Sequence, residues 1–287
     1  IWFVIWGALW GIYFLLDGYD LGAAALLPVI AKSPGDRNRI FNSVGPFWDG
    51  NEVWLITAGG VTFAAFPGTY ATMFSALYLP LMLILFGLIF RGGGIALREE
   101  AETEKSRNLW DWFFIIGSVM ASVLFGVAFA NIFKGIPIDG DGIFRGTIFH
   151  LFNWYGLLGG ALFFVYFLTH GGIWLAFKTD EDFHERAAGA VRKLYFALLI
   201  LAAGFLVGTW FATDLYANYL QSPLLFAIPL LAVAGLLAAG VFIFAGKWLA
   251  AWMMSSLFIF SATMFGVIGM FPALLPSSGG PADALCC

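Results

Sequence analysis

Long apolar runs, separated by short polar or charged segments, constrain this chain most strongly. The stretch "FALLILAAGFLVGTWFA" (196–212) carries no charged residue, and about 20 apolar residues suffice to cross a hydrocarbon core as a helix. With 61% hydrophobic and 11% charged residues, 287 residues hold too little polar surface to cover a water-soluble protein. We therefore predict an all-α integral membrane protein, a polytopic bundle of transmembrane helices.

The polar and Gly/Pro-rich joints divide the chain into eight predicted spans. No shift in composition marks a second domain, so we predict one transmembrane helical domain over residues 1–287. The spans are expected at about 2–31, 47–66, 70–90, 110–133, 149–177, 191–213, 223–245 and 249–274.

The basic residues predict the orientation of the bundle. Twelve of the 14 lysines and arginines fall in the first, third, fifth and seventh joints, and only Lys134 and Arg145 fall on the opposite side. Basic residues are enriched in cytoplasmic loops. We therefore expect the odd-numbered joints in the cytoplasm and the N-terminus outside.

The composition argues against a nucleic-acid partner and supports no role for the two cysteines. The net charge of −4 and the lack of a basic run exclude nucleic acid as a partner. Adjacent Cys286 and Cys287 suit neither a structural disulfide nor a metal site, so we assign them no role. The chain starts with Ile1 rather than methionine, and we expect residues before it.

Four acidic residues lie within two of the predicted spans. Asp17 and Asp20 are three residues apart in the first span, and Asp49 and Glu52 are three apart in the second, so each pair shares one helix face. Counted from the basic residues of the first joint, Asp20 and Asp49 would lie at similar depths, roughly 15–18 Å along a helix. Because no Lys or Arg falls in the interior of a predicted span, beyond its first turn, we expect no buried counter-charge from this chain.

Three interpretations of these acids stay open at this level. Carboxyl groups held in low dielectric suit a proton relay. Alternatively, "DGNE" (49–52) has the form of a capping box, and "GYD" (18–20) could be a Gly-loosened, hydrated helix segment. Third, the acids could coordinate a cation, as in a secondary transporter. Asp111, near a span end, is interpreted as an interfacial cap.

The histidines do not have the spacing of a haem site. His150 and His170 are 20 residues apart, which is about 30 Å on one helix, so they cannot ligate the same iron. His184 lies in a charged joint. We expect His170 to be a hydrogen-bonded packing residue, and we expect this chain alone to bind no haem and no metal.

Six stretches in chain order resemble subunit II of the cytochrome bd-type quinol oxidases. The longest and most specific is "GPFWDGNEVWLITAGGVTFAAFPGTYATMFSALYLP" (45–80). The others are "LDGYDLGAAALLP" (16–28), "LIFRG" (88–92), "WDWFFIIGS" (110–118), "GVAFANIFKGIP" (126–137) and "GMFPALLPSS" (269–278). Together they extend over nearly the whole chain.

This resemblance implies a subunit of a terminal respiratory oxidase that oxidises quinol and reduces dioxygen to water. In the family, subunit I carries haems b and d and the quinol-oxidising loop, and subunit II lacks haem ligands. The acids matched by Asp20 and Asp49, with Asp17 and Glu52 beside them, would line a cytoplasmic proton route. Trp54 matches a position near an oxygen route.

The resemblance also implies which molecules this chain contacts and in which membrane it lies. Subunit I would be the partner, with membrane lipids, quinol, small accessory subunits and, in some members, a quinone bound to subunit II. The location would be the cytoplasmic (inner) membrane of a bacterium or archaeon. The family usually has nine spans and eight are predicted here, so either the final helix is missing from this sequence or the variant is short. The alternative function is a cation-coupled secondary transporter that uses the embedded carboxylates.

Overall fold

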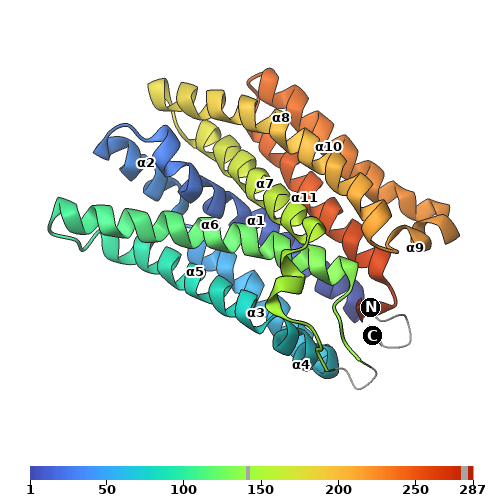
Figure 1. The fold of residues 1–287 in the computed structure, drawn as a ribbon. Helices are drawn as coiled ribbons and strands as arrows, with labels where there is room; N and C mark the ends of the chain where they lie inside the picture. The colour runs from blue at the N-terminus through green and yellow to red at the C-terminus, as the bar shows by residue number, and fades with distance from the viewer. Residues whose placement is uncertain (140–142, 279–283, 287) are drawn as a thin grey trace.

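A bundle of long, roughly parallel and antiparallel helices makes up the computed structural model, which describes residues 1–139, 143–278 and 284–286 (Figure 1). Among the described residues, seven helices are long and apolar enough to cross a membrane, and α10 is counted together with the short turn before it. They are α1 (Trp2–Ile30), α5 (Tyr78–Arg98), α6 (Glu104–Lys134), α7 (Trp154–Lys178), α8 (Glu181–Ala212), α10 (Ala227–Phe244) and α11 (Trp248–Met270). The predicted fold class, a helical membrane bundle, is confirmed.

Shorter elements connect and flank these helices. They are α2 (Pro34–Val44), α3 (Trp48–Ala65), α4 (Pro67–Ala76), η1 (Ile148–Phe152), α9 (Tyr216–Gln221) and η2 (Pro223–Phe226). Two short strands, β1 (Ala273–Leu275) and β2 (Leu285–Cys286), pair antiparallel near the C-terminus. Cys287 lies outside the described residues, so the absence of a role for the cysteine pair stays a prediction.

The second and third predicted spans differ from the structure. The span expected at 47–66 is α3, whose polar first turns lower its mean hydropathy, and α3 is not among the seven candidate spans. The span expected at 70–90 is divided between α4 and α5, which meet at Leu77. Helix α5 then continues through "RGGG" to Arg98, so this segment, expected to be a joint, is helical.

Helix α1 is the centre of the bundle. It packs against α3, α6, α7 and α11, and most of its side chains beyond the first turn are buried. Its approach to α7 is close because Gly22 faces the backbone of Phe167 and Gly171 faces the backbone of α1. A Cβ atom at either glycine would overlap the neighbouring main chain, so small residues set this helix–helix distance.

Helix α2, which lies outside the predicted spans, is held at the end of the bundle by charged contacts. Ser33 caps it and Pro34 follows, a common helix start. Arg186 of α8 donates to Asp36 at 2.7 Å. Burial of Asp36 opposes its ionisation, but the hydrogen bond from the Lys32 N–H and the charge of Arg186 hold the pKa of this carboxyl below its usual range.

Asp111 is a second anchor of α2 rather than an interfacial cap. Its carboxylate is 2% exposed and accepts from Arg37 of α2 at 2.7 Å and from Arg98 of α5 at 2.5 Å. Arg98 also donates to Asn38. One buried carboxylate of α6 therefore ties α2 to the α5–α6 hairpin.

The segments expected in the cytoplasm lie at one end of the bundle, where α2 and the α5–α6, α7–α8 and α10–α11 turns gather (Figure 1). Eleven of the 14 basic residues belong to these segments, because Arg91 lies inside α5 instead of in a joint. The excess of basic residues predicted for the odd-numbered joints is therefore found at this end of the bundle. Its assignment to the cytoplasm stays a prediction.

Topology can be tested with single cysteines in a background where Cys286 and Cys287 are replaced by serine. We expect Glu102→Cys and Glu185→Cys, both at exposed sites, to resist a membrane-impermeant thiol reagent in intact cells. The exposed Ser222→Cys at the other end should react. Both cytoplasmic sites should react after lysis, and labelling of either one in intact cells would contradict the orientation.

The close approach of α1 and α7 predicts the effect of Gly22→Leu. The added side chain has no space beside Phe167, and overpacking of this kind costs about 1–3 kcal/mol or more. We expect a lower thermal midpoint and less assembled membrane protein. Gly204→Leu on α8, where no atom lies within 4 Å of an added Cβ, is the matched control. An equal loss of stability in both variants would contradict the packing explanation, because leucine has the higher helix propensity at both positions.

Candidate functional site

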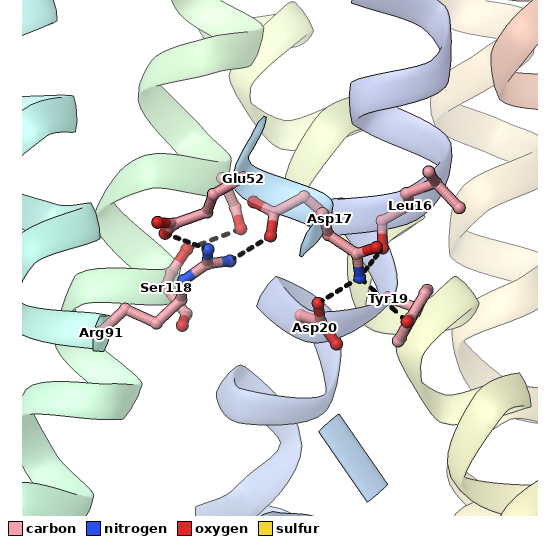
Figure 2. A network of polar contacts seen from close by, with 9 residues as sticks. Leu16, Asp17, Tyr19, Asp20, Glu52, Arg91 and Ser118 are labelled. Atoms are coloured by element: carbon pink, nitrogen blue, oxygen red, sulfur yellow. Dashed lines mark hydrogen bonds and ion pairs between the residues drawn. The ribbon is translucent and has the colours of Figure 1, made fainter. Parts of the chain in front are cut away.

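A buried arginine lies between two of the predicted acidic residues. Arg91 of α5 is fully buried; its Nη1 donates to Asp17 Oδ1 of α1 at 2.7 Å, and its Nη2 forms a short ion pair with Glu52 of α3. Figure 2 shows the guanidinium group reaching between the two carboxyl groups. The expectation that these acids have no buried counter-charge in this chain is therefore wrong.

Asp20 lies beside this ion-pair cluster without a cation of its own. Its Oδ2 accepts from Asn51 Nδ2 at 2.7 Å, and the same amide group lies 2.9 Å from the Tyr19 hydroxyl. The other carboxyl oxygen, Oδ1, is buried and has no hydrogen-bond partner among the described residues. Asn51, the residue before Glu52 on α3, thus connects α3 to Asp20 on α1.

Asp49 does not belong to the buried group. It is exposed in the first turn of α3 and makes no hydrogen bond or ion pair within the described part of the chain. The acids therefore form a series in burial. Asp49 is exposed, the Glu52 side chain is 23% exposed, and Asp17 and Asp20 are 0% exposed.

The capping interpretation of "DGNE" does not match the structure. Helix α3 begins at Trp48, its N-cap residue is Phe47, and no side chain caps it. Glu52 contacts Arg91 instead of the start of its own helix. The hydrated-helix interpretation of "GYD" also fails, because α1 is continuous from Trp2 to Ile30 and both of its acids are buried.

Asp49 does not lie at the expected depth. A depth counted from Arg39 requires one continuous helix from the basic joint to Asp49, but residues 34–44 form the separate helix α2. Counting residues from Arg39 therefore does not measure the depth of Asp49, which is exposed at the beginning of α3.

Trp54 lies on α3 two residues beyond Glu52. It is half-buried and packs against the apolar core. It is therefore on the same helix as Asn51 and Glu52, and its role near an oxygen route stays a prediction.

His170 has the hydrogen bonds of a packing residue. It is fully buried; its Nε2 donates to the Leu15 carbonyl at 3.1 Å and its Nδ1 accepts from Ser255 Oγ at 2.9 Å. Tyr166 and Trp252 stack with its ring. Because both ring nitrogens are engaged, His170 as placed does not fit an axial haem ligand.

The remaining histidines do not assemble a ligand set either. His150 is exposed and its Nδ1 accepts from the Thr147 N–H, while His184 contacts the Ala176 carbonyl. No group of three or more His, Cys, Asp or Glu residues among those described is arranged to hold a metal ion.

Sequence reasoning missed Arg91 and Asn51. Arg91 precedes "GGG", a pattern that predicts a joint, but α5 is continuous from the apolar run before Arg91 to Arg98. Asn51 sits between Asp49 and Glu52, and its polarity inside a span was the available signal. The three carboxyl groups, one guanidinium and one amide could together hold and exchange protons, with the ion pair keeping the buried charge partly compensated.

Comparisons with known proteins agree with the resemblance in the sequence. The family described as "Cytochrome bd terminal oxidase subunit II" matches residues 1–285. The chain is 33% identical to cytochrome bd-I ubiquinol oxidase subunit 2 of Escherichia coli (strain K12), covering 97% of this chain and 82% of that protein. It is 31% identical to cytochrome bd ubiquinol oxidase subunit 2 of Bacillus subtilis (strain 168), covering 85% and 71%.

One solved structure shares the fold. A chain of the bd oxidase from Geobacillus thermodenitrificans superposes with a TM-score of 0.77 at 17% sequence identity, covering 98% of this chain and 86% of that one. A helical bundle of this arrangement, an acid-rich α1–α3 pair and a sequence match along almost the full length lead to one conclusion. The chain belongs to the cytochrome bd terminal oxidase subunit II family.

Proposed function

We propose that this terminal oxidase subunit carries protons through its buried carboxyl cluster toward a dioxygen-reducing site on a partner subunit, and that it binds no haem itself. The observation that carries the proposal is the Glu52–Arg91–Asp17 ion pair with Asp20 beside it. Quinol would be the electron donor, as the names of the relatives say of those proteins.

The burial of the acids gives the route its direction. Asp49 is exposed at the start of α3, Glu52 is partly exposed, and Asp17 and Asp20 are fully buried on α1. The start of α3 follows α2 at the end of the bundle that carries most basic residues. Protons would therefore be taken up at Asp49 and Glu52 from the cytoplasm and passed inward.

The charge balance gives the cluster a capacity for protons. Arg91 contacts two carboxyl groups and can neutralise only one of them, and Asp20 has an amide as its partner. An uncompensated carboxylate in a membrane interior is costly. Binding or release of one proton therefore changes the net charge without separating Arg91 from a partner.

Haem chemistry belongs to the partner in this proposal. Each of the three histidines makes a hydrogen bond within the chain, His170 in α7, His150 in η1 and His184 in α8, which supports the absence of an axial pair. Haems b and d in subunit I would supply electron transfer and dioxygen reduction. This subunit would support that partner, with membrane lipids and small accessory subunits around the pair, in a bacterial or archaeal inner membrane.

Two further roles follow from the resemblance and have structural support. Trp54 on the half-buried face of α3 would line an oxygen route, because dioxygen is apolar and partitions into such surfaces. An apolar cavity between α6, α7, α8, α10 and α11 would hold the tail of a bound quinone. Its lining includes Phe129, Phe163, Tyr166 and Phe258.

The cation-coupled transporter is not favoured. Family membership indicates an oxidase subunit. The cluster also contains its own guanidinium at the place where a transported cation would need free carboxylate oxygens.

The relay predicts slow turnover for Asp20→Asn. The amide oxygen can still accept from Asn51, so packing is kept while the titratable group is lost. We expect an assembled complex with normal haem content and oxygen consumption per haem reduced about tenfold or more, in the range of lost proton-transfer groups. Oxygen uptake in membranes, normalised to haem, is the measurement.

Asp111→Asn is the matched control for this test. Asp111 is buried, as Asp20 is. It is ion-paired with Arg37 and Arg98 and lies outside the cluster. We expect less assembled complex but an unchanged rate per haem. If Asp20→Asn runs at the wild-type rate per haem from pH 6 to 8, the relay is wrong and Asp20 has a packing role.

The proposal also predicts that the isolated chain binds no haem. The chain expressed without its partner and reconstituted with haem should show no stoichiometric Soret band, because His170 donates and accepts within the bundle. A Soret band that disappears in His170→Ala would contradict this assignment. Equal weak absorbance in wild type and His170→Ala would indicate nonspecific haem and leave the expectation intact.

A further inference from the structure

We propose that a cavity between α2 and the α5–α6 hairpin binds the phosphate group of an anionic membrane phospholipid. The cavity has a volume of about 460 Å³. Four basic residues and two acidic residues line it, which gives a net positive lining. These are Lys32, Arg37, Arg98, Arg107, Glu104 and Asp111.

Asp111 fixes two of the basic groups in place. It accepts from Arg37 Nη1 and from Arg98 Nε, and it is itself buried. Arg98 also lies over the Phe41 ring, 4.3 Å from its centroid. A phosphate arriving in the cavity would therefore meet guanidinium groups that are already ordered, which lowers the entropy cost of binding.

Several donors at the cavity remain available. Within the described residues, Arg37 and Arg98 form no hydrogen bond through Nη2, and Arg107 uses only Nε, toward the Ala101 carbonyl. Lys32 makes no side-chain ion pair in this part of the chain. Phosphate oxygens accept well from such planar guanidinium groups.

The helix geometry adds to the positive potential. The cavity includes Ser33 and Pro34 at the start of α2 and Glu104 at the start of α6. Helix N-termini favour anions. Two N-termini and four basic side chains therefore converge on one cavity.

The surrounding apolar surface favours a lipid over a free anion. The cavity lies where α5 ends and α6 begins, so in a membrane it would face the headgroup layer. Leu97, Leu109 and Trp112 adjoin the cavity residues in sequence and are about half exposed, at 46%, 53% and 54%. These side chains would contact the acyl chains below a bound headgroup.

The test uses the whole oxidase complex with Lys32→Gln and Arg107→Gln combined, which leaves the Asp111 contacts intact. The complex is placed in nanodiscs of phosphatidylcholine with or without phosphatidylglycerol, released, and examined by native mass spectrometry for retained lipid. We expect wild type to retain phosphatidylglycerol, and the double variant to retain it about tenfold less, since each basic residue near a membrane surface contributes appreciably.

The matched control is Lys105→Gln with Lys193→Gln, which removes the same charge from exposed residues outside the cavity lining. It should retain phosphatidylglycerol as wild type does. If the double variant does not assemble, Arg107→Gln alone is compared with Lys105→Gln alone in the same way. Equal loss in variant and control would overturn the proposal in favour of a general charge effect.

A second measurement distinguishes a lipid headgroup from free inorganic phosphate as the bound anion. Thermal midpoints of wild type are measured with phosphatidylglycerol and, separately, with inorganic phosphate. A rise with phosphatidylglycerol that depends on Lys32 and Arg107, and no comparable rise with phosphate, supports the proposal. Equal stabilisation by inorganic phosphate without lipid retention, or retention of phosphatidylcholine to the same extent, would overturn it.

Discussion

The ion pair of Arg91 with Asp17 and Glu52 joins three helices in the interior of the bundle. Removing one charged partner from such a pair leaves an uncompensated buried charge, at a cost of about 3–5 kcal/mol. The guanidinium group of α5 therefore requires α1 and α3 to hold their carboxyl groups within hydrogen-bond distance. Asn51 then places Asp20 in the same region. The positions of α1, α3 and α5 depend on one another through this single side chain.

Close backbone approach makes these contacts achievable. Gly94 of α5 faces the backbone of Trp110 and Phe114 on α6, and Gly22 of α1 faces α7. Between membrane helices the driving force is packing and polar contact, since lipid is as apolar as the protein. Small residues bring the main chains together, and the buried charges fix the register between them.

Two charged clusters, each with one arginine of α5, have different surroundings and different proposed uses. The Arg91 cluster is buried among α1, α3 and α5, where a change of proton occupancy has a large electrostatic effect. The Asp111 cluster lies at the end of α5 and α6 beside an open cavity. Its arginines are ordered but retain free donors, as suits a headgroup. Proton exchange and lipid binding are thus proposed for separate residues.

The sequence by itself determined the membrane class, the helical bundle, the family and three acids of the buried cluster, because apolar run length and rare embedded charges are local properties of a chain. It misplaced Arg91 in a joint and grouped exposed Asp49 with the buried acids. Tertiary structure decided both points. Whether "RGGG" continues a helix depends on α6 lying close enough to cover Gly94, and whether an acid is buried depends on which helices surround it. Those distances are set by packing between segments far apart in the sequence.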